Sequence, residues 1–412
     1  METQNIVLIT IDSLRADAVQ HMPNLLTLGN GGGVFQVYSN GPSTPFSFPS
    51  IFNINYHPFY DETKIRSPTI VENYRNIGYK TVGIVANNPY ISNLSGYNKG
   101  FIHFEDYMSE LRTNKRSTTS NIIQKLPNLF RDFKNIYKWY FKSDITSSNG
   151  SITAVEDSID SINGQEPFFL WLHLMDTHYP YTPPLKETEF SPLDIVKLNH
   201  FRKIHRLKKS NDKNKLLQLK KLYADCVRWT DQVLNNFFMT LKEHDLWEKT
   251  DILVTADHGE GFYEHGFLGH PAQLYEELVR VPLVVKIQGM KNKKIKFTEL
   301  RDVPKILDNE ISSHNEEIKN NKIENKIIPL RARHAGDRSC MKGDINLIGN
   351  PDKLKYNIYG IVSGKYKIIY DDEDGKIELY NLIKDPKEKK DISKKRKKFI
   401  QKFLEEYPFK KS

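Results

Sequence analysis

The stretch Asn5-Ile-Val-Leu-Ile-Thr-Ile11, which runs directly into Asp12, decides the fold. A short run of apolar and β-branched residues without polar alternation is typical of a strand that is buried on both faces of a sheet. Four more segments have the same character and end at polar residues: 80–86, 167–173, 251–256 and 281–286. The pattern predicts a sheet whose strands are covered from both sides.

Segments with helical spacing lie between these strands, at residues 67–77 and 220–242. Alternation of strands and helices predicts an α/β fold, a mostly parallel sheet sandwiched between helices. Residues 29–49 are rich in Gly, Ser and Pro, so we expect them to be mostly loop. Residues 356–382 instead alternate in the antiparallel manner around a turn at 371–375, which predicts a small C-terminal antiparallel subdomain.

The same patterns predict three regions along the chain. Residues 1–290 form the domain that would carry the chemistry, interrupted by basic, helix-prone insertions at 108–150 and 186–221. Residues 291–335 are rich in Lys and Asn and are interpreted as a variable connection. Residues 336–412 hold the C-terminal hairpin and a basic tail.

Composition narrows the class of protein. The chain has 412 residues, is 38% hydrophobic and carries a net charge of +9, which favours anionic partners. No run of eighteen apolar residues occurs, and the N-terminus lacks the features of a signal peptide, so we expect neither membrane helix nor secretion. Cys226 and Cys340 are interpreted as free thiols, and the expected location is cytoplasmic. Without a zinc-finger or RNA-recognition signature, nucleic acid is not an expected partner.

Polar clusters follow three of the predicted strands. The first strand ends in Asp12, the third in His173 and the segment up to His178, and the fourth in Asp257-His258, followed by His265 and His270. Ligand sites in open α/β sheets form beyond the carboxyl ends of the strands, so these side chains should converge. Singly, Asp12 could cap a helix and His173 could pack in the core. Together, carboxylates and imidazoles from separate strand ends predict a divalent-metal site.

Hydroxyl groups occur in the loop at residues 41–50, where Ser43 and Thr44 are the first candidates. Ser and Thr in a Pro-rich segment are ordinarily turn formers. A hydroxyl becomes a useful nucleophile when a metal ion or a base lowers its pKa.

Several motifs, in order along the chain, resemble the sulfatase family of the alkaline phosphatase and sulfatase superfamily. They are Asn5-Ile-Val-Leu-Ile-Thr-Ile-Asp-Ser-Leu-Arg-Ala-Asp17, Trp171-Leu-His-Leu-Met-Asp-Thr-His178, Thr255-Ala-Asp-His-Gly-Glu260, Glu264-His-Gly266, Arg280-Val-Pro-Leu283 and the late Leu379-Tyr-Asn-Leu382. The resemblance implies an alkaline-phosphatase-like fold and hydrolysis of sulfate or phosphate esters.

The nucleophile motif departs from the family pattern. Sulfatases carry a Cys or Ser that becomes formylglycine, followed by an Arg. Aligning Ser50-Ile-Phe-Asn53 with the family places Thr44 at the modified position and Phe48 at the Arg, whereas a Pro-based alignment would select Ser43. Because neither alignment gives the full signal, no formylglycine is expected. The spacing is similar to that of the phosphoethanolamine transferases, which use an unmodified Thr, so we favour Thr44 over Ser43.

The metal ligands depart as well. Classical sulfatases hold calcium with oxygen ligands, whereas this chain has His258 after Asp257. Imidazole nitrogen favours Zn²⁺ or Mn²⁺ over Ca²⁺. The resemblance to the transferases implies that His178 and His270 bind a second ion or the substrate, with His265 as a substitute. His173 would contact the substrate or pack in the core, and Glu260 stays unassigned.

These observations predict a hydrolase of sulfate or phosphate esters that uses one or two divalent ions, with Asp12, Thr44, Asp257, His258 and His270 as ligands and Thr44 and His178 as catalytic residues. The alternatives are a transferase that moves a phosphoryl-linked head group onto a glycan or lipid, and a non-catalytic anion-binding protein. The substrate would be an anionic ester, which a glycan or lipid could carry. An aromatic stripe flanked by cations at 127–142 could contact a membrane surface or pack on the core. The sequence does not indicate an oligomeric state.

Overall fold

The computed structural model contains a central seven-stranded sheet in the order β2-β9-β6-β1-β5-β3-β4. The structure describes residues 4–61, 64–107, 147–164, 167–206, 210–288, 298–307, 327–334 and 356–406. The strands of this sheet are β1 (Asn5–Ile11), β2 (Gly33–Tyr38), β3 (Lys80–Val85), β4 (His103–Glu105), β5 (Phe168–Leu174), β6 (Thr250–Ala256) and β9 (Arg280–Lys286). The five strands expected from the sequence are therefore all present, and the α/β fold class is confirmed.

Strand β1 lies at the centre of the sheet and is buried along its whole length. It pairs in parallel with β5 and β6, so that Ile11 lies opposite both Leu174 and Ala256. The residues after these three strands therefore leave the sheet at the same edge. Strand β9 runs antiparallel to β6 and to β2, which makes the sheet mixed at one side.

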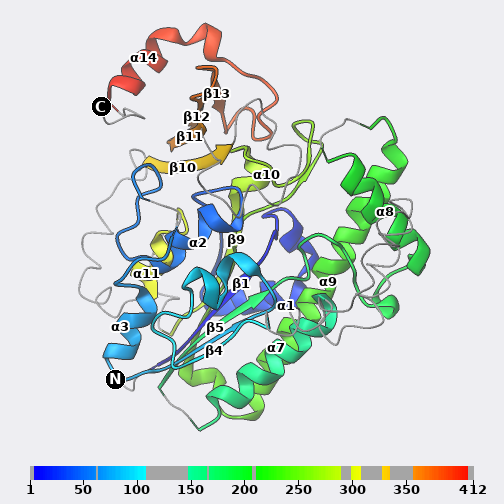
Figure 1. Ribbon diagram of the computed structural model, residues 1–412, viewed down its shortest axis with the longest axis vertical. Helices are drawn as coiled ribbons and strands as arrows, with labels where there is room; N and C mark the ends of the chain where they lie inside the picture. The colour runs from blue at the N-terminus through cyan, green and yellow to red at the C-terminus, as the bar shows by residue number, and fades with distance from the viewer. Residues whose placement is uncertain are drawn as a thin grey trace, which may run out of the picture.

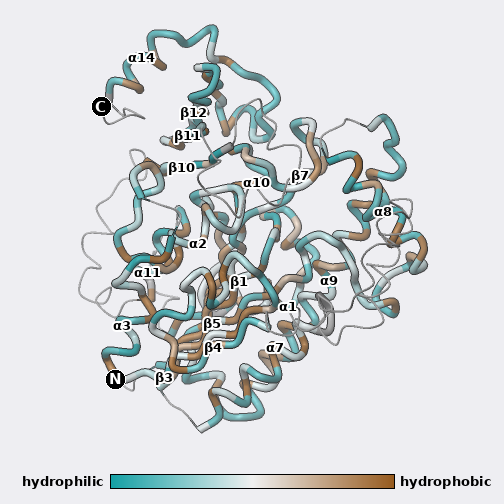
Figure 2. Tube along the Cα trace, in the orientation of Figure 1, coloured by the Kyte–Doolittle hydropathy of each residue, from teal (hydrophilic) through white to brown (hydrophobic). Residues whose placement is uncertain are grey.

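Helices cover both faces of the sheet (Figure 1). The helix bounds are α1 (Pro23–Leu28), α2 (Thr44–Phe52), α3 (Ile70–Asn76), α7 (Ser147–Ile162), α8 (Pro192–Ile204), α9 (Lys213–Glu243), α10 (Glu276–Val279), α11 (Asp302–Leu307) and α14 (Lys397–Glu406). Helix α9 packs against α1, α7 and α8, and α2 packs against α11. Figure 2 shows apolar residues gathered along the strands between these layers. Among the described residues, no helix combines the length and apolar character needed to cross a membrane.

The segment at residues 29–49 differs from the expectation of a loop. It contains strand β2 and the start of helix α2. Eight of the nine residues of α2 are buried, although Pro45 and Pro49 lie within it. A Pro in the first turn of a helix loses no hydrogen bond, and tertiary burial outweighs the weak propensity of the rest.

A second sheet, of four antiparallel strands, packs above the first (Figure 1). Its strands are β10 (Ile327–His334), β11 (Tyr356–Ser363), β12 (Tyr366–Asp371) and β13 (Ile377–Asn381). The turn expected at 371–375 joins β12 to β13. Strand β10 pairs along its length with β11, so part of the stretch 291–335 belongs to this sheet. The proposed membrane-contact stripe at 127–142 lies outside the described residues.

A buried lysine joins the two sheets. Lys367 on β12 is fully buried, and its Nζ lies 3.0 Å from Oε1 of Glu276 on α10 and 2.9 Å from Oε1 of Glu388. Removing one partner of a buried ion pair leaves uncompensated charge in a low dielectric. Lys367→Met should therefore lower the free energy of unfolding by about 3–5 kcal/mol. Urea denaturation would measure this, with the exposed Lys365→Met as the control; equal stabilities for the two variants would contradict it.

Candidate metal centre and nucleophile

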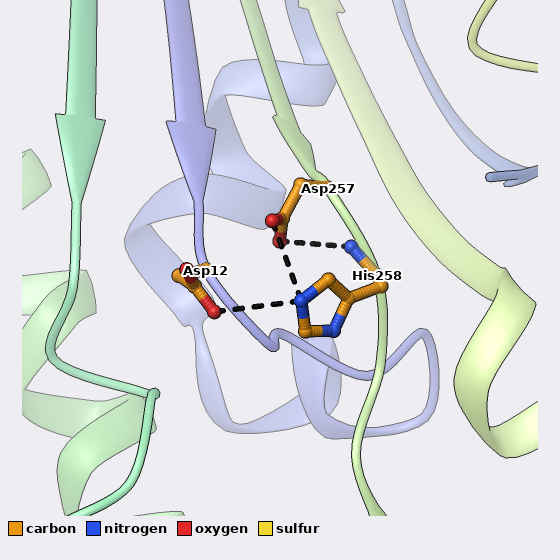
Figure 3. A group of neighbouring side chains, drawn as sticks. All are labelled: Asp12, Asp257 and His258. Atoms are coloured by element: carbon orange, nitrogen blue, oxygen red, sulfur yellow. Dashed lines mark hydrogen bonds and ion pairs between the residues drawn. The ribbon is translucent and has the colours of Figure 1, made fainter. Parts of the chain in front are cut away.

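Three ligand residues converge at the carboxyl edge of the central sheet. Asp12 follows β1, and Asp257 and His258 follow the neighbouring strand β6. All three side chains are fully buried. Figure 3 shows them pointing toward one another from the two strand ends. The parallel register of β1 and β6 places them there, because Ile11 lies opposite Ala256.

The ligand atoms of this group lie within 4.8 Å of one another. Nε2 of His258 lies 3.7 Å from Oδ1 of Asp12 and 3.4 Å from Oδ2 of Asp257. Nδ1 of His258 lies 2.9 Å from the carbonyl oxygen of Gly259, which orients the ring so that Nδ1 donates and Nε2 faces the two carboxylates. That Nε2 is buried and has no hydrogen-bond partner among the described residues. Two carboxylates and a free imidazole nitrogen fit a divalent cation.

The electrostatics of the group also fit a cation. Burial and the neighbouring charge of Asp12 raise the pKa of Asp257. Burial alone would raise the pKa of Asp12 too, but nearby His178, His173 and His258 hold it well below its usual range. Two buried carboxylates in contact repel each other when both are ionised, and a bound divalent ion removes that repulsion.

Thr44 brings a hydroxyl to the same group. It is the first residue of α2 and is 4% exposed. Its Oγ1 donates to Oδ2 of Asp257 at 2.9 Å and lies 3.4 Å from Oδ2 of Asp12. The position at a helix N-terminus favours negative charge on this oxygen. The hydroxyl thus lies where both a cation and an acceptor can activate it.

Ser43 and Phe48 flank or follow Thr44 in the same segment and make other contacts. Ser43 is the N-cap of α2, and its backbone carbonyl accepts from Phe46 and Ser47. Phe48, at the position of the family's Arg, is fully buried and packs against the ring of His173 at 5.3 Å. An apolar ring therefore fills the place where a sulfatase-type Arg would contribute charge.

Three residues contact the Asp12 carboxylate. Asn88 donates from Nδ2 to Oδ2 of Asp12 at 2.9 Å, and the Ser13 hydroxyl donates to Oδ1 at 2.7 Å. Nε2 of His173 lies 3.8 Å from Oδ2, while its Nδ1 contacts the Thr10 hydroxyl at 2.9 Å. Since His173 is fully buried behind Asp12, the structure assigns it a supporting contact with this carboxylate.

Ser13 adopts a left-handed backbone conformation, with φ of 60°. This conformation aims its backbone N–H at Oδ1 of Asp257, at 3.1 Å. A non-glycine residue in this region costs about 1–2 kcal/mol, and such strain concentrates at functional sites. Ser13 therefore contacts both carboxylates of the candidate metal site.

A second group of histidines lies beside the metal centre. The His270 ring is 4.4 Å from that of His258 and 5.3 Å from that of His178. Burial and the proximity of His258 lower the pKa of His270 to about 3, so its ring is neutral at physiological pH. A neutral imidazole beside the first site is suited to metal coordination.

The carboxylate of Glu260 orients the His270 ring. Oε2 of Glu260 accepts from Nδ1 of His270 at 2.8 Å, and its Oε1 accepts from Arg202 on α8 at 2.8 Å. Although burial alone would raise the pKa of Glu260, the Arg202 guanidinium and His270 lower it below its usual range. Gly269, with φ of +92°, permits the close approach of Arg202, because a Cβ there would lie 2.7 Å from Nη2. Glu260 and Arg202 thus direct Nε2 of His270 away from the carboxylate.

His265 belongs to a separate cluster. Its Nδ1 lies 2.7 Å from Glu277 and its Nε2 3.0 Å from the carbonyl oxygen of Glu388, and its ring stacks on Tyr275 at 3.7 Å. The structure therefore places it between α10 and the segment around Glu388, apart from the group of Asp12, Asp257 and His258.

Replacing Glu260 tests the role of the carboxylate between His270 and Arg202. Glu260→Gln keeps the shape but removes the charge that orients the imidazole, and supporting residues of this kind typically change metal affinity or activity by about 10–100-fold. We expect a fall in kcat of that size, with binding of the first metal ion unchanged. The exposed Glu189→Gln is the matched control. An unchanged kcat for Glu260→Gln would contradict the assignment.

Two contributors were not expected from the sequence. Asn88 follows strand β3, so the rule that ligands gather at strand ends could have found it. Arg202 lies in the insertion at 186–221 and is 5% exposed, but no spacing in the sequence distinguishes it from the exposed Lys and Arg around it.

The sequence of this chain is similar to a known family and to several known proteins. The Sulfatase family model matches residues 4–316. An arylsulfatase from Clostridium perfringens (strain 13 / Type A) is 24% identical, over 93% of this chain and 89% of the relative. The multifunctional alkaline phosphatase superfamily protein PehA from Trinickia caryophylli is 22% identical, over 70% of this chain and 69% of the relative.

Solved structures share the fold over almost the whole chain. The phosphonate monoester hydrolase of Agrobacterium radiobacter has a TM-score of 0.66 at 16% identity, with 98% of this chain and 95% of that chain covered. The structure of BT4656 in complex with its substrate D-glucosamine-2-N,6-O-disulfate has a TM-score of 0.68 at 15% identity, with both chains fully covered.

Proposed function

This chain belongs to the sulfatase family, and from that premise we propose that it hydrolyses sulfate or phosphate esters with Thr44 as the nucleophile and a divalent metal ion as cofactor. It is an ester hydrolase of the alkaline phosphatase and sulfatase superfamily. The relatives named arylsulfatase and phosphonate monoester hydrolase make aryl sulfates and phosphonate monoesters the first substrates to test.

One observation carries the proposal. The Thr44 hydroxyl lies 2.9 Å from Asp257 and 3.4 Å from Asp12, in the group that His258 completes. A nucleophile in contact with an acceptor and with a cation site is the arrangement that covalent ester hydrolysis requires. When bound, the ion would lower the pKa of the hydroxyl and neutralise charge on the transferred group.

The residues divide the reaction between them. Thr44 Oγ1 forms the new bond to phosphorus or sulfur as the bond to the leaving oxygen breaks, and its proton passes to Oδ2 of Asp257, the acceptor of its hydrogen bond. The leaving alcohol takes a proton from solvent, and water then cleaves the adduct on Thr44 to regenerate the hydroxyl. His178 and His270, whose rings are 5.3 Å apart beside the site, contact the transferred group or hold a second ion.

The ligand set supports Zn²⁺ or Mn²⁺ over Ca²⁺, because His258 contributes nitrogen and hard calcium prefers oxygen. Neither Ser43 nor Thr44 lies within the full sulfatase modification signal, since Phe48 stands at the Arg position if Thr44 is aligned and Ser47 stands there if Ser43 is aligned. We therefore propose an unmodified Thr44 and no formylglycine.

A substrate screen tests the proposal. The purified protein, freed of metal by a chelator and then supplied with Zn²⁺, Mn²⁺ or Ca²⁺, would be assayed with aryl sulfates, phosphate monoesters, phosphodiesters and phosphonates. We expect turnover of at least one class with Zn²⁺ or Mn²⁺ and little with Ca²⁺. Turnover that is independent of metal, or metal binding without turnover of any ester, would contradict it. A single burst of alcohol release that an added acceptor alcohol extends would instead indicate a head-group transferase.

A further inference from the structure

Arg202 lies in the last turn of α8 and Arg206 lies two residues beyond its end, and only Arg202 has its counter-ion among the described residues. The Arg202 guanidinium contacts Oε1 of Glu260 at 2.8 Å and lies 4.1 Å from the centre of the Tyr179 ring. The positive charge of Arg202 is thus compensated within the protein. The second arginine, Arg206, has no such ion pair among the described residues.

The Arg206 side chain is largely enclosed. Its carbonyl oxygen accepts from the backbone N–H of Leu268 at 3.1 Å, which ties this end of the insertion to the segment that leads to His270. Its Nε is buried and has no hydrogen-bond partner among the described residues. Burial and the like charge of Arg202 lower the pKa of Arg206, while Glu260, Tyr90 and Tyr179 raise it.

The residues around Arg206 place it at the rim of the metal centre. Tyr90 is two residues from Asn88, which contacts Asp12, and Tyr179 directly follows His178. The nearby carboxylate, Glu260, already binds Arg202 and His270. Arg206 therefore lies close to Glu260, the carboxylate that binds His270, and its backbone contacts Leu268, two residues before His270.

We propose that Arg206 binds a second anionic group on the substrate, so that this enzyme prefers sulfate or phosphate esters whose alcohol part also carries a carboxylate, sulfate or phosphate. Arg206 is partly buried and its enclosed Nε has no hydrogen-bond partner among the described residues, which is unfavourable for a guanidinium; an anionic ligand relieves this. The planar fork of an Arg matches such groups with two parallel hydrogen bonds. The inference rests on the proposed function in taking an ester as the ligand of the neighbouring centre.

A binding experiment tests Arg206 without turnover. Isothermal titration of the zinc-loaded, desalted protein would compare ethylphosphonate with phosphonoacetate, which adds a carboxylate at similar length. We expect phosphonoacetate to bind the wild type at least ~10-fold more tightly, as a charge-assisted hydrogen bond would give. Arg206→Gln should abolish this difference and Arg206→Lys should keep part of it. Lys197→Gln, which removes an exposed charge from the preceding helix α8, should retain the full difference.

Steady-state kinetics would show which second anionic group on the substrate the enzyme prefers. Para-nitrophenyl phosphate would be compared with derivatives that carry a ring carboxylate, sulfate or phosphate. Arg206→Gln should raise KM about 10-fold for the preferred derivative, while kcat and the kinetics of the plain ester stay unchanged. The melting temperature of this variant should not fall, because the replaced charge has no partner among the described residues.

Failure of this inference is distinguishable from failure of the proposed function. Equal affinities of wild type for the two phosphonates, or a difference that persists in Arg206→Gln, would overturn the role of Arg206 even in an active enzyme. A difference that depends on Arg206, in a protein that cleaves no ester, would support the anion site and contradict the proposed function.

Discussion

Replacement of Thr44 by alanine is expected to abolish turnover while the protein stays folded. The substitution removes the oxygen that contacts Asp257 and Asp12 and that forms the covalent bond. Loss of a nucleophile should lower kcat/KM on the order of 10³-fold or more, which corresponds to about 4 kcal/mol of transition-state stabilisation. Steady-state kinetics on the best ester of the substrate screen would measure the effect.

Two controls accompany the Thr44 variant. The free energy of unfolding should change by only about 1 kcal/mol, since one hydrogen bond is lost. Ser43→Ala, which alters the adjacent N-cap residue, should retain most of the activity. An active Thr44→Ala together with an inactive Ser43→Ala would show that the nucleophile is one residue earlier in the chain.

Asp257→Asn is expected to remove the tightly bound metal ion. Asp257 is fully buried and contacts Thr44, Ser13 and His258 at once. Replacing the carboxylate by an amide keeps the shape but removes the charge that attracts a divalent cation. Metal affinity should fall by more than the factor of about 10–100 that is typical when a residue supporting a metal ligand is replaced. Elemental analysis of the purified variant, and activity titrated with added Zn²⁺, would measure both consequences.

His258→Ala should lose the same ion, because Nε2 of His258 completes the group. His270→Ala should lower only a second equivalent of metal, since His270 lies beside the first group and is oriented by Glu260. A wild type with a single tightly bound calcium ion, unaffected by His270→Ala, would contradict the two-ion arrangement.

The strands that frame the candidate metal centre could be predicted from the sequence for a physical reason. Strand β1 has the bounds expected from its apolar run, because burial on both faces leaves a signal that local residues carry. The polar residues Asp12, Asp257 and His258 could be placed together because parallel neighbours end at one edge of a sheet. Family resemblance then added Thr44, which the structure brings into contact with both carboxylates.

Other parts depended on tertiary structure that no local pattern encodes. Helix α2 arises in a Pro-rich segment because eight of its residues are buried, which sequence propensity alone does not indicate. His265 follows the metal motif closely in sequence, yet the turn at Gly266 and Gly269, both with positive φ, separates it from His270. The contacts of Arg202 with Glu260 join residues 58 positions apart, so no short spacing could reveal them.

The most direct test of the account is identification of the covalent intermediate on Thr44. The zinc-loaded enzyme would be mixed with its best ester, quenched with acid within the first turnover and digested for mass spectrometry. We expect a phosphoryl or sulfuryl group on the peptide that contains Thr44, absent from Thr44→Ala and from metal-free protein. A fully active enzyme whose adduct lies on another residue, or a formylglycine in place of either Ser43 or Thr44, would contradict it.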